Sequence, residues 1–137
     1  MSEADLILGT PWLEHGRDRN GFDCYGVALW LGKIWATPLP DVSELVAELW
    51  ARSVSDAREF GGLPEGWRAI EIREARRGDV VWMRNELDAQ GLVDHLEIVE
   101  ELGYSITAVR NHGVVRRRWT RAWRDRIHEV WRAPCFA

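Results

Sequence analysis

The spacing of apolar residues changes along this chain, from a helical period in its first half to a strand period in its second. The first helical stripe consists of Val27, Trp30 and Leu31. It follows Asp23, whose side chain is well suited to cap a helix, so that Cys24 falls in the first turn. This pattern predicts a helix that begins at Cys24 and ends near residues 32–33.

A second stripe predicts another helix over about residues 42–59. Its apolar positions are Leu45, Val46, Leu49 and Trp50. Asp41 and Glu44 have the three-residue offset of a capping box at its start. A proline-containing connector at 38–40 and a glycine-rich loop at 61–66 bound this segment.

From Trp67 onward, the apolar residues alternate or form short runs, which is typical of strands. Strands are expected at 69–72, 80–83, 92–99, 105–109 and 113–115. A turn at 102–104 makes a hairpin of the third and fourth of them. The segment 119–131 fits both a short helix and strand ends, and both interpretations stay open. Helices followed by antiparallel strands predict a single α+β domain over residues 1–137.

The composition restricts the class of protein. The chain has 137 residues, enough for one sizeable core, and nine tryptophans. It contains no run of 18 apolar residues, so we expect no membrane insertion. The acidic residues 1–5 lack the basic and apolar regions of a secretory signal peptide. Two cysteines, Cys24 and Cys135, provide no disulfide framework, and we expect both thiols to be free.

The net charge of −4 conceals an uneven distribution. From Arg110 to the end, the chain carries eight arginines and two acidic residues, a net charge of +6, which leaves −10 for the rest. Such a segment is either a surface for an acidic partner or a solvated face that balances an acidic body. No nucleic-acid-binding signature accompanies it, so we expect no nucleic-acid partner.

Cys24 is the first candidate for chemistry. At a helix N-terminus, free backbone N–H groups and the positive end of the helix dipole favour a thiolate. Glycines flank this turn, and Gly26 is expected to let a substrate backbone approach it. An arbitrary cysteine is more often a small buried residue of a core helix, but this placement favours a nucleophile.

A cysteine nucleophile needs a histidine and a group that orients the imidazole. Of the four histidines, His95 lies inside a predicted strand, where it can face the start of the Cys24 helix. Thr107, on the returning strand, shares a face with His95 if the hairpin closes near residues 101–102. His112 is chemically the better orienting group, but its position requires a bulge. The choice between Thr107 and His112 stays open.

An ordered set of motifs resembles the NlpC-type cysteine peptidases, which are papain-like cell-wall endopeptidases. The matching segments are Pro11-Trp12, Gly16-Arg17-Asp18, Gly21-Phe22-Asp23-Cys24-Tyr25-Gly26, Gly78-Asp79-Val80-Val81, His95-Leu96-Glu97-Ile98-Val99 and Gly113-Val114-Val115. They run from about residue 8 to Val115. The chain is most similar to the short versions encoded among tail genes of phages and gene transfer agents.

The resemblance implies a papain-like NlpC fold, with N-terminal helices packed on a small antiparallel sheet. It implies Cys24 as the nucleophile, His95 as the general base and Thr107 at the third position, without a cofactor or metal. The implied substrate is the peptidoglycan stem peptide, at its γ-D-glutamyl–diamino-acid bond. In the tail versions, the implied partners are tail-tip or hub proteins, and the implied location is the virion tail tip after synthesis in the host cytoplasm.

Three residues depart from the family pattern. Thr107 stands where the family commonly has a histidine, and Glu97 stands where it usually has glycine. A carboxylate at position 97 is expected to crowd the cleft, contact a substrate amine or face solvent. Trp12 replaces a tyrosine whose hydroxyl often borders the site, and an indole offers only a donor.

Two function hypotheses follow. The first is a peptidoglycan-cleaving cysteine peptidase of a phage or phage-like tail tip, acting through an acyl-enzyme to aid DNA entry. The second is a catalytically weak or inactive tail-tip module of the same fold, which the three departures favour. A zinc site built from Cys24, His95 and His112 lacks the usual ligand spacing and is disfavoured.

Overall fold

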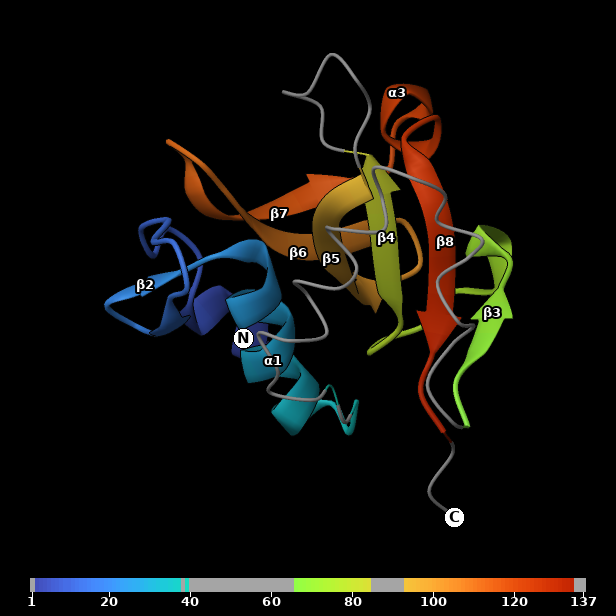
Figure 1. The fold of residues 1–137 in the computed structure, drawn as a ribbon, viewed down its shortest axis with the longest axis horizontal. Helices are drawn as coiled ribbons and strands as arrows, with labels where there is room; N and C mark the ends of the chain where they lie inside the picture. Colours follow the sequence, from blue (N-terminus) through green and yellow to red (C-terminus); the bar gives the residue numbers. More distant parts are fainter. Residues whose placement is uncertain (1, 38, 40–65, 85–92, 135–137) are drawn as a thin grey trace.

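The computed structural model describes residues 2–37, 39, 66–84 and 93–134. The helix expected over 42–59, its flanking loops, the loop at 86–91 and Cys135 lie almost entirely outside these residues. Within the described part, a six-stranded antiparallel sheet carries one main helix (Figure 1). No described helix is long and apolar enough to cross a membrane.

The main helix, α1, spans Cys24–Ile34 and begins where the sequence predicts. Asp23 is its N-cap, and the carboxylate accepts a hydrogen bond from the backbone N–H of Gly26. A short two-stranded sheet, β1 (Arg17–Asp18) and β2 (Gly21–Phe22), leads directly into the helix. The start of α1 is therefore fixed both by its cap and by the preceding hairpin.

Six strands form the large sheet in the order β3-β8-β4-β5-β6-β7, and every neighbouring pair is antiparallel. Their bounds are β3 Arg68–Ile70, β4 Val80–Arg84, β5 Val93–Glu101, β6 Tyr104–Val109, β7 Gly113–Arg118 and β8 Ile127–Arg132. Three short helices complete the described elements: η1 Glu3–Leu6, η3 Ile72–Glu74 and α3 Arg121–Arg124.

Most of the sequence-based strand predictions are confirmed, with two differences. The strand expected at 69–72 ends at Ile70, because Ile72 already begins η3. For the segment 119–131, the sequence leaves both a short helix and strand ends possible. The structure contains both, because the short helix α3 is followed directly by β8. Thr120 caps α3 by accepting a hydrogen bond from the Trp123 backbone N–H.

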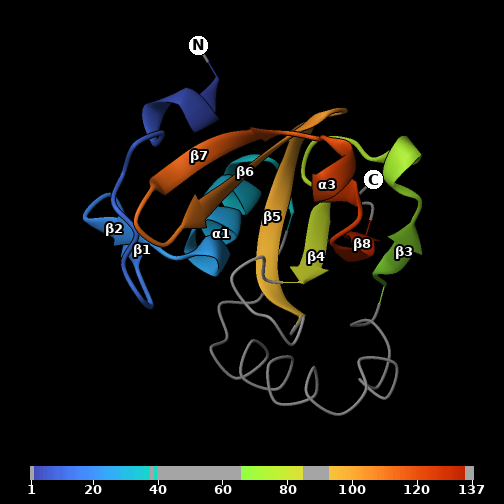
Figure 2. The same ribbon diagram turned by 90° about the horizontal axis from the view of Figure 1, so that it is seen from above.

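Alternating residues of the central strands divide the core into two clusters, because successive side chains point to opposite faces of a sheet. Val80 and Trp82 of β4 pack in the cluster that contains α1, together with Leu96 and Ile98 of β5. Val81 and Met83 pack in the other, with Val99 and the stacked pair of Trp119 and Trp123. Figure 2 shows α1 against β5 and β6, and α3 beyond β5.

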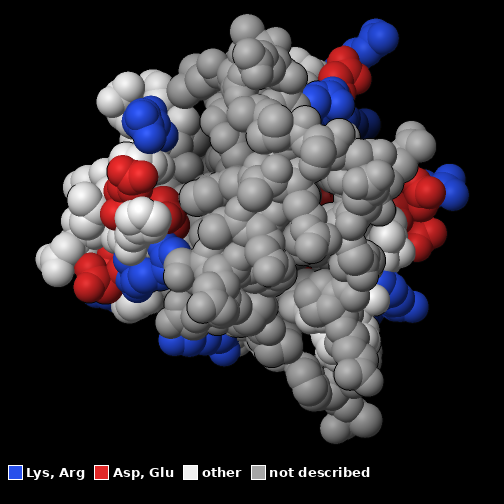
Figure 3. Space-filling model, viewed as in Figure 1, with Lys and Arg blue, Asp and Glu red and all other residues white. Residues whose placement is uncertain are grey.

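Three arginines of the basic C-terminal part are paired with acidic residues of the body. Arg116 binds Glu100 and Asp5, Arg117 lies 2.9 Å from Glu97, and Arg132 lies 2.9 Å from Asp79. On the face shown in Figure 3, basic and acidic side chains are interleaved along the flanks. Part of the positive charge therefore balances the acidic body within the fold.

Candidate active site

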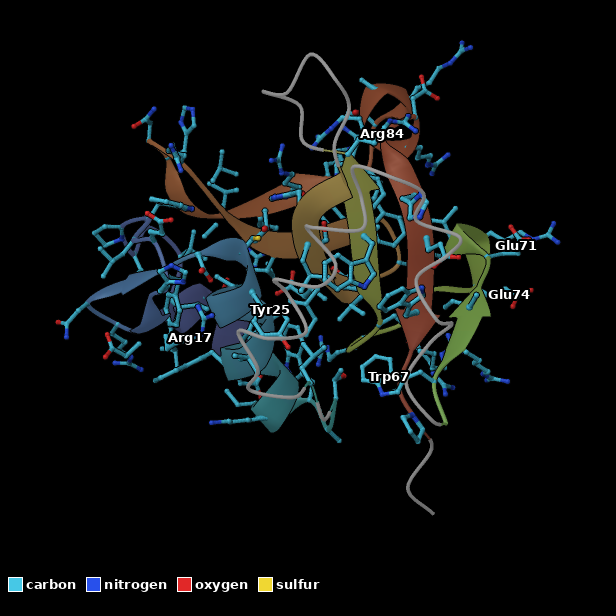
Figure 4. The ribbon with its side chains drawn as sticks, viewed as in Figure 1. Arg17, Tyr25, Trp67, Glu71, Glu74 and Arg84 are labelled. Carbon is cyan, nitrogen blue, oxygen red and sulfur yellow. The ribbon has the colours of Figure 1, made fainter. Side chains whose placement is uncertain are left out.

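Cys24 lies at the first position of α1, half-buried and with a free thiol. The preceding Asp23 accepts three hydrogen bonds: from the Gly26 backbone N–H at 2.7 Å, from the His15 backbone N–H at 3.1 Å and from the Arg17 guanidinium at 2.7 Å. Arg17 also lies over the Tyr25 ring, 5.5 Å from its centroid (Figure 4). These contacts hold the turn that presents the thiol.

Gly26 has a different role from the one expected from the sequence. A Cβ atom built at Gly26 would lie 2.0 Å from the carbonyl oxygen of Gly16, so the loop backbone packs directly on the helix there. The close approach is within the protein, and Gly26 is buried. The expectation that Gly26 admits a substrate backbone is therefore wrong, and the glycine instead allows the loop before Cys24 to pack on α1.

His95 lies on β5, opposite Met83 of β4, and its side chain is 12% exposed. The imidazole interacts with the Cys24 thiol and forms a hydrogen bond with Glu97. Burial alone would lower the pKa of His95, but its interactions with Cys24 and Glu97 raise it to about 9. This environment favours the imidazolium form of His95, and the structure brings His95 together with Cys24.

Glu97 contributes a carboxylate to this site. None of the three arrangements expected from the sequence for position 97 is a contact with His95. It is fully buried, and one oxygen, Oε2, lies 2.9 Å from His95 Nε2 and 2.9 Å from Arg117 Nε. The other, Oε1, accepts hydrogen bonds from the Ser105 hydroxyl and, at 3.0 Å, from the Trp123 indole. It neither faces solvent nor stands free in a cleft.

The surroundings of Glu97 keep it ionised. Burial would raise the pKa of this carboxyl, but the hydrogen bond with His95 and the charges of His95 and Arg117 hold it below its usual value. An anionic carboxylate thus lies against the imidazolium on the side away from solvent. Since Nε2 is occupied in this way, Nδ1 is the ring nitrogen left for the thiol.

Thr107 lies on the same side of the hairpin as His95, as the alternation of strand residues predicts. Its hydroxyl oxygen is 3.4 Å from His95 Nε2. Its proton is donated to the Leu96 carbonyl oxygen at 2.8 Å. Thr107 is therefore near the imidazole, but its contact is longer than that of Glu97 and carries no charge.

His112, the other candidate for the third position, lies in the turn between β6 and β7 and is exposed. Asn111 in this turn adopts a positive φ of 72°. Among the described contacts, none joins His112 to His95. His112 instead lines an open pocket of about 590 Å³ that is formed with Pro11, Trp12, Glu14, Arg110, Asn111 and Gly113.

Trp12 lines the same pocket and lies beside the strand that precedes Cys24. Trp12 pairs with Phe22, two residues before Cys24, and the Arg110 guanidinium lies 4.6 Å from the Trp12 ring centroid. The pocket therefore combines an aromatic face with a guanidinium, an imidazole and the Glu14 carboxylate. Within the described residues, no three His, Cys, Asp or Glu side chains gather as metal ligands.

Solved structures similar to this chain share one fold. A lipoprotein of the NLP/P60 family from Staphylococcus aureus matches with a TM-score of 0.64 and 22% identity, over 98% of this chain and 40% of that one. The NlpC/p60 domain of the peptidoglycan hydrolase SagA matches with a TM-score of 0.59 and 20% identity, over 93% of this chain and 91% of that one.

An NlpC/P60 family protein from Bacillus cereus matches with a TM-score of 0.60 and 17% identity, over 93% of this chain and 36% of that one. This chain thus spans less than half the length of the Staphylococcus and Bacillus proteins. No protein-family model and no curated protein sequence matches it. The chain has the fold of NlpC/P60 domains, as the sequence motifs imply.

Proposed function

We propose that this chain is a cysteine peptidase that hydrolyses amide bonds of peptidoglycan stem peptides through an acyl-enzyme. The observation that carries the proposal is the contact between the Cys24 thiol, at the N-terminus of α1, and the buried His95. An imidazolium beside a thiol at a helix N-terminus favours the thiolate, which is the nucleophilic form. The fold shared with a domain of a peptidoglycan hydrolase supports the choice of substrate.

In the acylation step, Cys24 Sγ attacks the carbonyl carbon of the scissile amide and forms a carbon–sulfur bond. The carbonyl oxygen becomes an oxyanion. The backbone N–H of Cys24, at the first helical position, has no acceptor within the helix, which supports a role as the donor to that oxygen. The carbon–nitrogen bond then breaks as the His95 imidazolium gives its proton to the leaving amine.

In the deacylation step, water attacks the thioester carbonyl carbon while neutral His95 accepts a proton from that water. The carbon–sulfur bond breaks, the peptide leaves as a carboxylic acid, and the thiolate–imidazolium pair is restored. Each step uses the same two side chains, which the structure holds in contact.

The pocket lined by Trp12, Glu14, Arg110 and His112 is the proposed binding place for part of the stem peptide. Stem peptides carry both carboxylates and amines, and this pocket offers groups of both charges beside an aromatic face. The pairing of Trp12 with Phe22 brings it close in sequence and space to the turn that holds Cys24.

Digestion of purified peptidoglycan tests this function. The wild-type chain is expected to release muropeptides with new amino and carboxyl termini, as measured by liquid chromatography and mass spectrometry. Cys24→Ala and His95→Ala should each reduce release by about 10³-fold or more. Cys135→Ser is the matched control, because it removes the other cysteine and should leave release unchanged. Equal release by wild type and Cys24→Ala would contradict the proposal.

We further propose that the enzyme acts at the tip of a phage or phage-like tail, docked on tail-tip proteins, to open the wall for DNA entry. The resemblance of the sequence motifs to tail-encoded NlpC-type peptidases supports this location. Immunodetection should find the chain in purified tail particles. Particles that are complete and infectious without the chain would contradict it, and a Cys24→Ala chain that still supports infection would favour a docking module without catalysis.

A further inference from the structure

We propose that Glu97 is the positioning residue of the His95 imidazole, in place of a side chain at position 107 or 112. This inference rests on the proposed cysteine-peptidase function. The orienting group would then come from the same strand as the histidine, two residues further along β5. The sequence motifs place no orienting group at position 97.

Distance and charge favour Glu97 over Thr107. Glu97 Oε2 lies 2.9 Å from His95 Nε2, whereas the Thr107 hydroxyl oxygen lies 3.4 Å away. The Thr107 hydroxyl also donates its one proton to the Leu96 carbonyl oxygen. A hydrogen bond from an imidazolium to a carboxylate is charge-assisted, and it is shorter and stronger than one to a neutral hydroxyl.

The position of the Glu97 carboxylate is determined by partners from three other elements. Ser105 of β6 and Trp123 of α3 donate to Oε1, and Arg117 of β7 pairs with Oε2. With both oxygens engaged and the side chain fully buried, the carboxylate has one orientation. A fixed carboxylate can hold the imidazole in a single ring orientation, as a positioning residue must.

The charges along this line alternate. The Arg117 guanidinium lies against the Glu97 carboxylate, which lies against the His95 imidazolium, which contacts the Cys24 sulfur. Arg117 helps keep Glu97 ionised, and the Glu97 charge helps keep His95 protonated. Such an arrangement favours transfer of the thiol proton to the imidazole, and it fixes the N–H tautomer at Nε2 so that Nδ1 faces the thiol.

The inference also accounts for Thr107. Because Glu97 occupies the Nε2 side of the ring, the side chain on the returning strand does not need to orient the imidazole. Thr107 is fully buried and bonded to backbone, which is the pattern of a structural residue. The differences from the family pattern at positions 97 and 107 then have one explanation: the group that orients the imidazole lies on β5 instead of β6.

Titration of the full-length chain by NMR separates the two candidates. The variants are Glu97→Gln, which removes the charge with little change of shape, and Thr107→Val, which removes the hydroxyl in the same way. Glu97→Gln should lower the pKa of His95 by at least one unit and slow Cys24 alkylation at pH 7 by about tenfold or more. Thr107→Val should leave the proton dissociation constant of His95 and the Cys24 alkylation rate each within about twofold of the wild-type value.

Ser105→Ala is the matched control, because it removes one donor to Glu97 without touching the imidazole. It should change alkylation much less than Glu97→Gln. Glu97→Asp, which keeps the charge but withdraws it by one methylene, serves if Glu97→Gln does not fold, and should give an intermediate loss. A His95 titration that shifts in Thr107→Val, or stays unchanged in Glu97→Gln or Glu97→Asp, would overturn the inference.

The two proposals fail in distinguishable ways. An unreactive Cys24 in the wild-type chain counts against the cysteine-peptidase function itself. The effect of Glu97 on His95 is measured by NMR without any substrate or reactive thiol. If wild-type Cys24 is reactive and its alkylation rate is unchanged in Glu97→Gln, only the positioning role is overturned.

Discussion

Glu97 keeps a full negative charge inside the protein through hydrogen bonds with His95 of β5, Ser105 of β6 and Trp123 of α3, and through an ion pair with Arg117 of β7. Removing a charge from water is costly unless each lone pair is satisfied, and here both oxygens have two partners. The same partners would be left without compensation if the carboxylate were deleted. Arg117 would then carry a positive charge without its partner, and His95 would lose the charge that favours its protonated form.

Deleting this side chain should therefore destabilise the fold. Glu97→Ala is expected to lower the free energy of unfolding by about 3–5 kcal/mol, because it leaves uncompensated charge and a cavity. Glu97→Gln should cost less, since it retains shape and several hydrogen bonds. Urea unfolding followed by tryptophan fluorescence measures both, and a loss below about 1 kcal/mol in Glu97→Ala would show that the network contributes little to folding.

The sequence points to Cys24 and His95 as candidates because their signals are local: a cap and an apolar stripe for the cysteine, and a strand pattern for the histidine. The alternation that places Thr107 on the face of His95 applies equally to Glu97, two residues away on the same strand. Sequence alone could not show that Ser105, Arg117 and Trp123 surround this carboxylate. Their positions depend on the pairing of β5 with β6 and β7, and on α3.

At the scale of single elements, the start of α1 depends on close backbone packing. The loop that contains Gly16 lies on the helix at Gly26, and the carboxylate of Asp23 connects the helix, His15 and Arg17. The position of Cys24 is therefore set by the preceding hairpin as well as by the helix. Displacement of this loop would move the thiol relative to His95.

Gly26→Ala tests this packing. Its new Cβ would lie 2.0 Å from the Gly16 carbonyl oxygen, so backbone must shift, and we expect a loss of about 1–3 kcal/mol or more in the free energy of unfolding. Cys24 alkylation at pH 7 should slow in parallel. Gly32→Ala in the same helix is the control, because its Cβ would meet the Thr37 carbonyl oxygen at 2.8 Å and lies far from the thiol along α1. Unchanged stability and reactivity in Gly26→Ala would contradict the account of this turn.

The position of the last strand, β8, in the sheet cannot be predicted from the local spacing of apolar residues. Trp119 and Trp123 are four residues apart, and the cap at Thr120 gives one helical turn, after which Ile127 begins β8. β8 then inserts between β3 and β4, so the end of the chain completes the middle of the sheet. This pairing joins residues more than 40 positions apart, and no local spacing predicts it.

At the scale of the whole molecule, buried charge links stability to pH. Interactions with Arg116 and Ser2 hold the pKa of Glu100 below its usual value, and Glu97 is shifted in the same direction. Stability from lowered carboxyl pKa values is present above about 4.5 and is lost as pH falls through the folded values. The raised pKa of His95 acts oppositely: its contribution is complete below about 6.5 and is lost as pH rises through about 9.

The free energy of unfolding should therefore be greatest between about pH 5 and pH 7 and decline on both sides. Urea unfolding at intervals from pH 3 to pH 10 measures this profile. In His95→Gln, whose side chain does not titrate, the decline between pH 7 and pH 10 should be smaller than in the wild type. A wild-type profile that stays level to pH 10 would show that His95 does not gain its proton affinity on folding.

The central claim is that Cys24 and His95 form a thiolate–imidazolium pair at the start of α1, and the pH dependence of Cys24 alkylation tests it most directly. The measurement uses the Cys135→Ser background, so that Cys24 is the only thiol, with and without His95→Ala. We expect alkylation well below pH 8 in the presence of His95 and its loss in His95→Ala. A Cys24 that reacts as an ordinary thiol, with a midpoint near pH 8.5 whether or not His95 is present, would contradict the account.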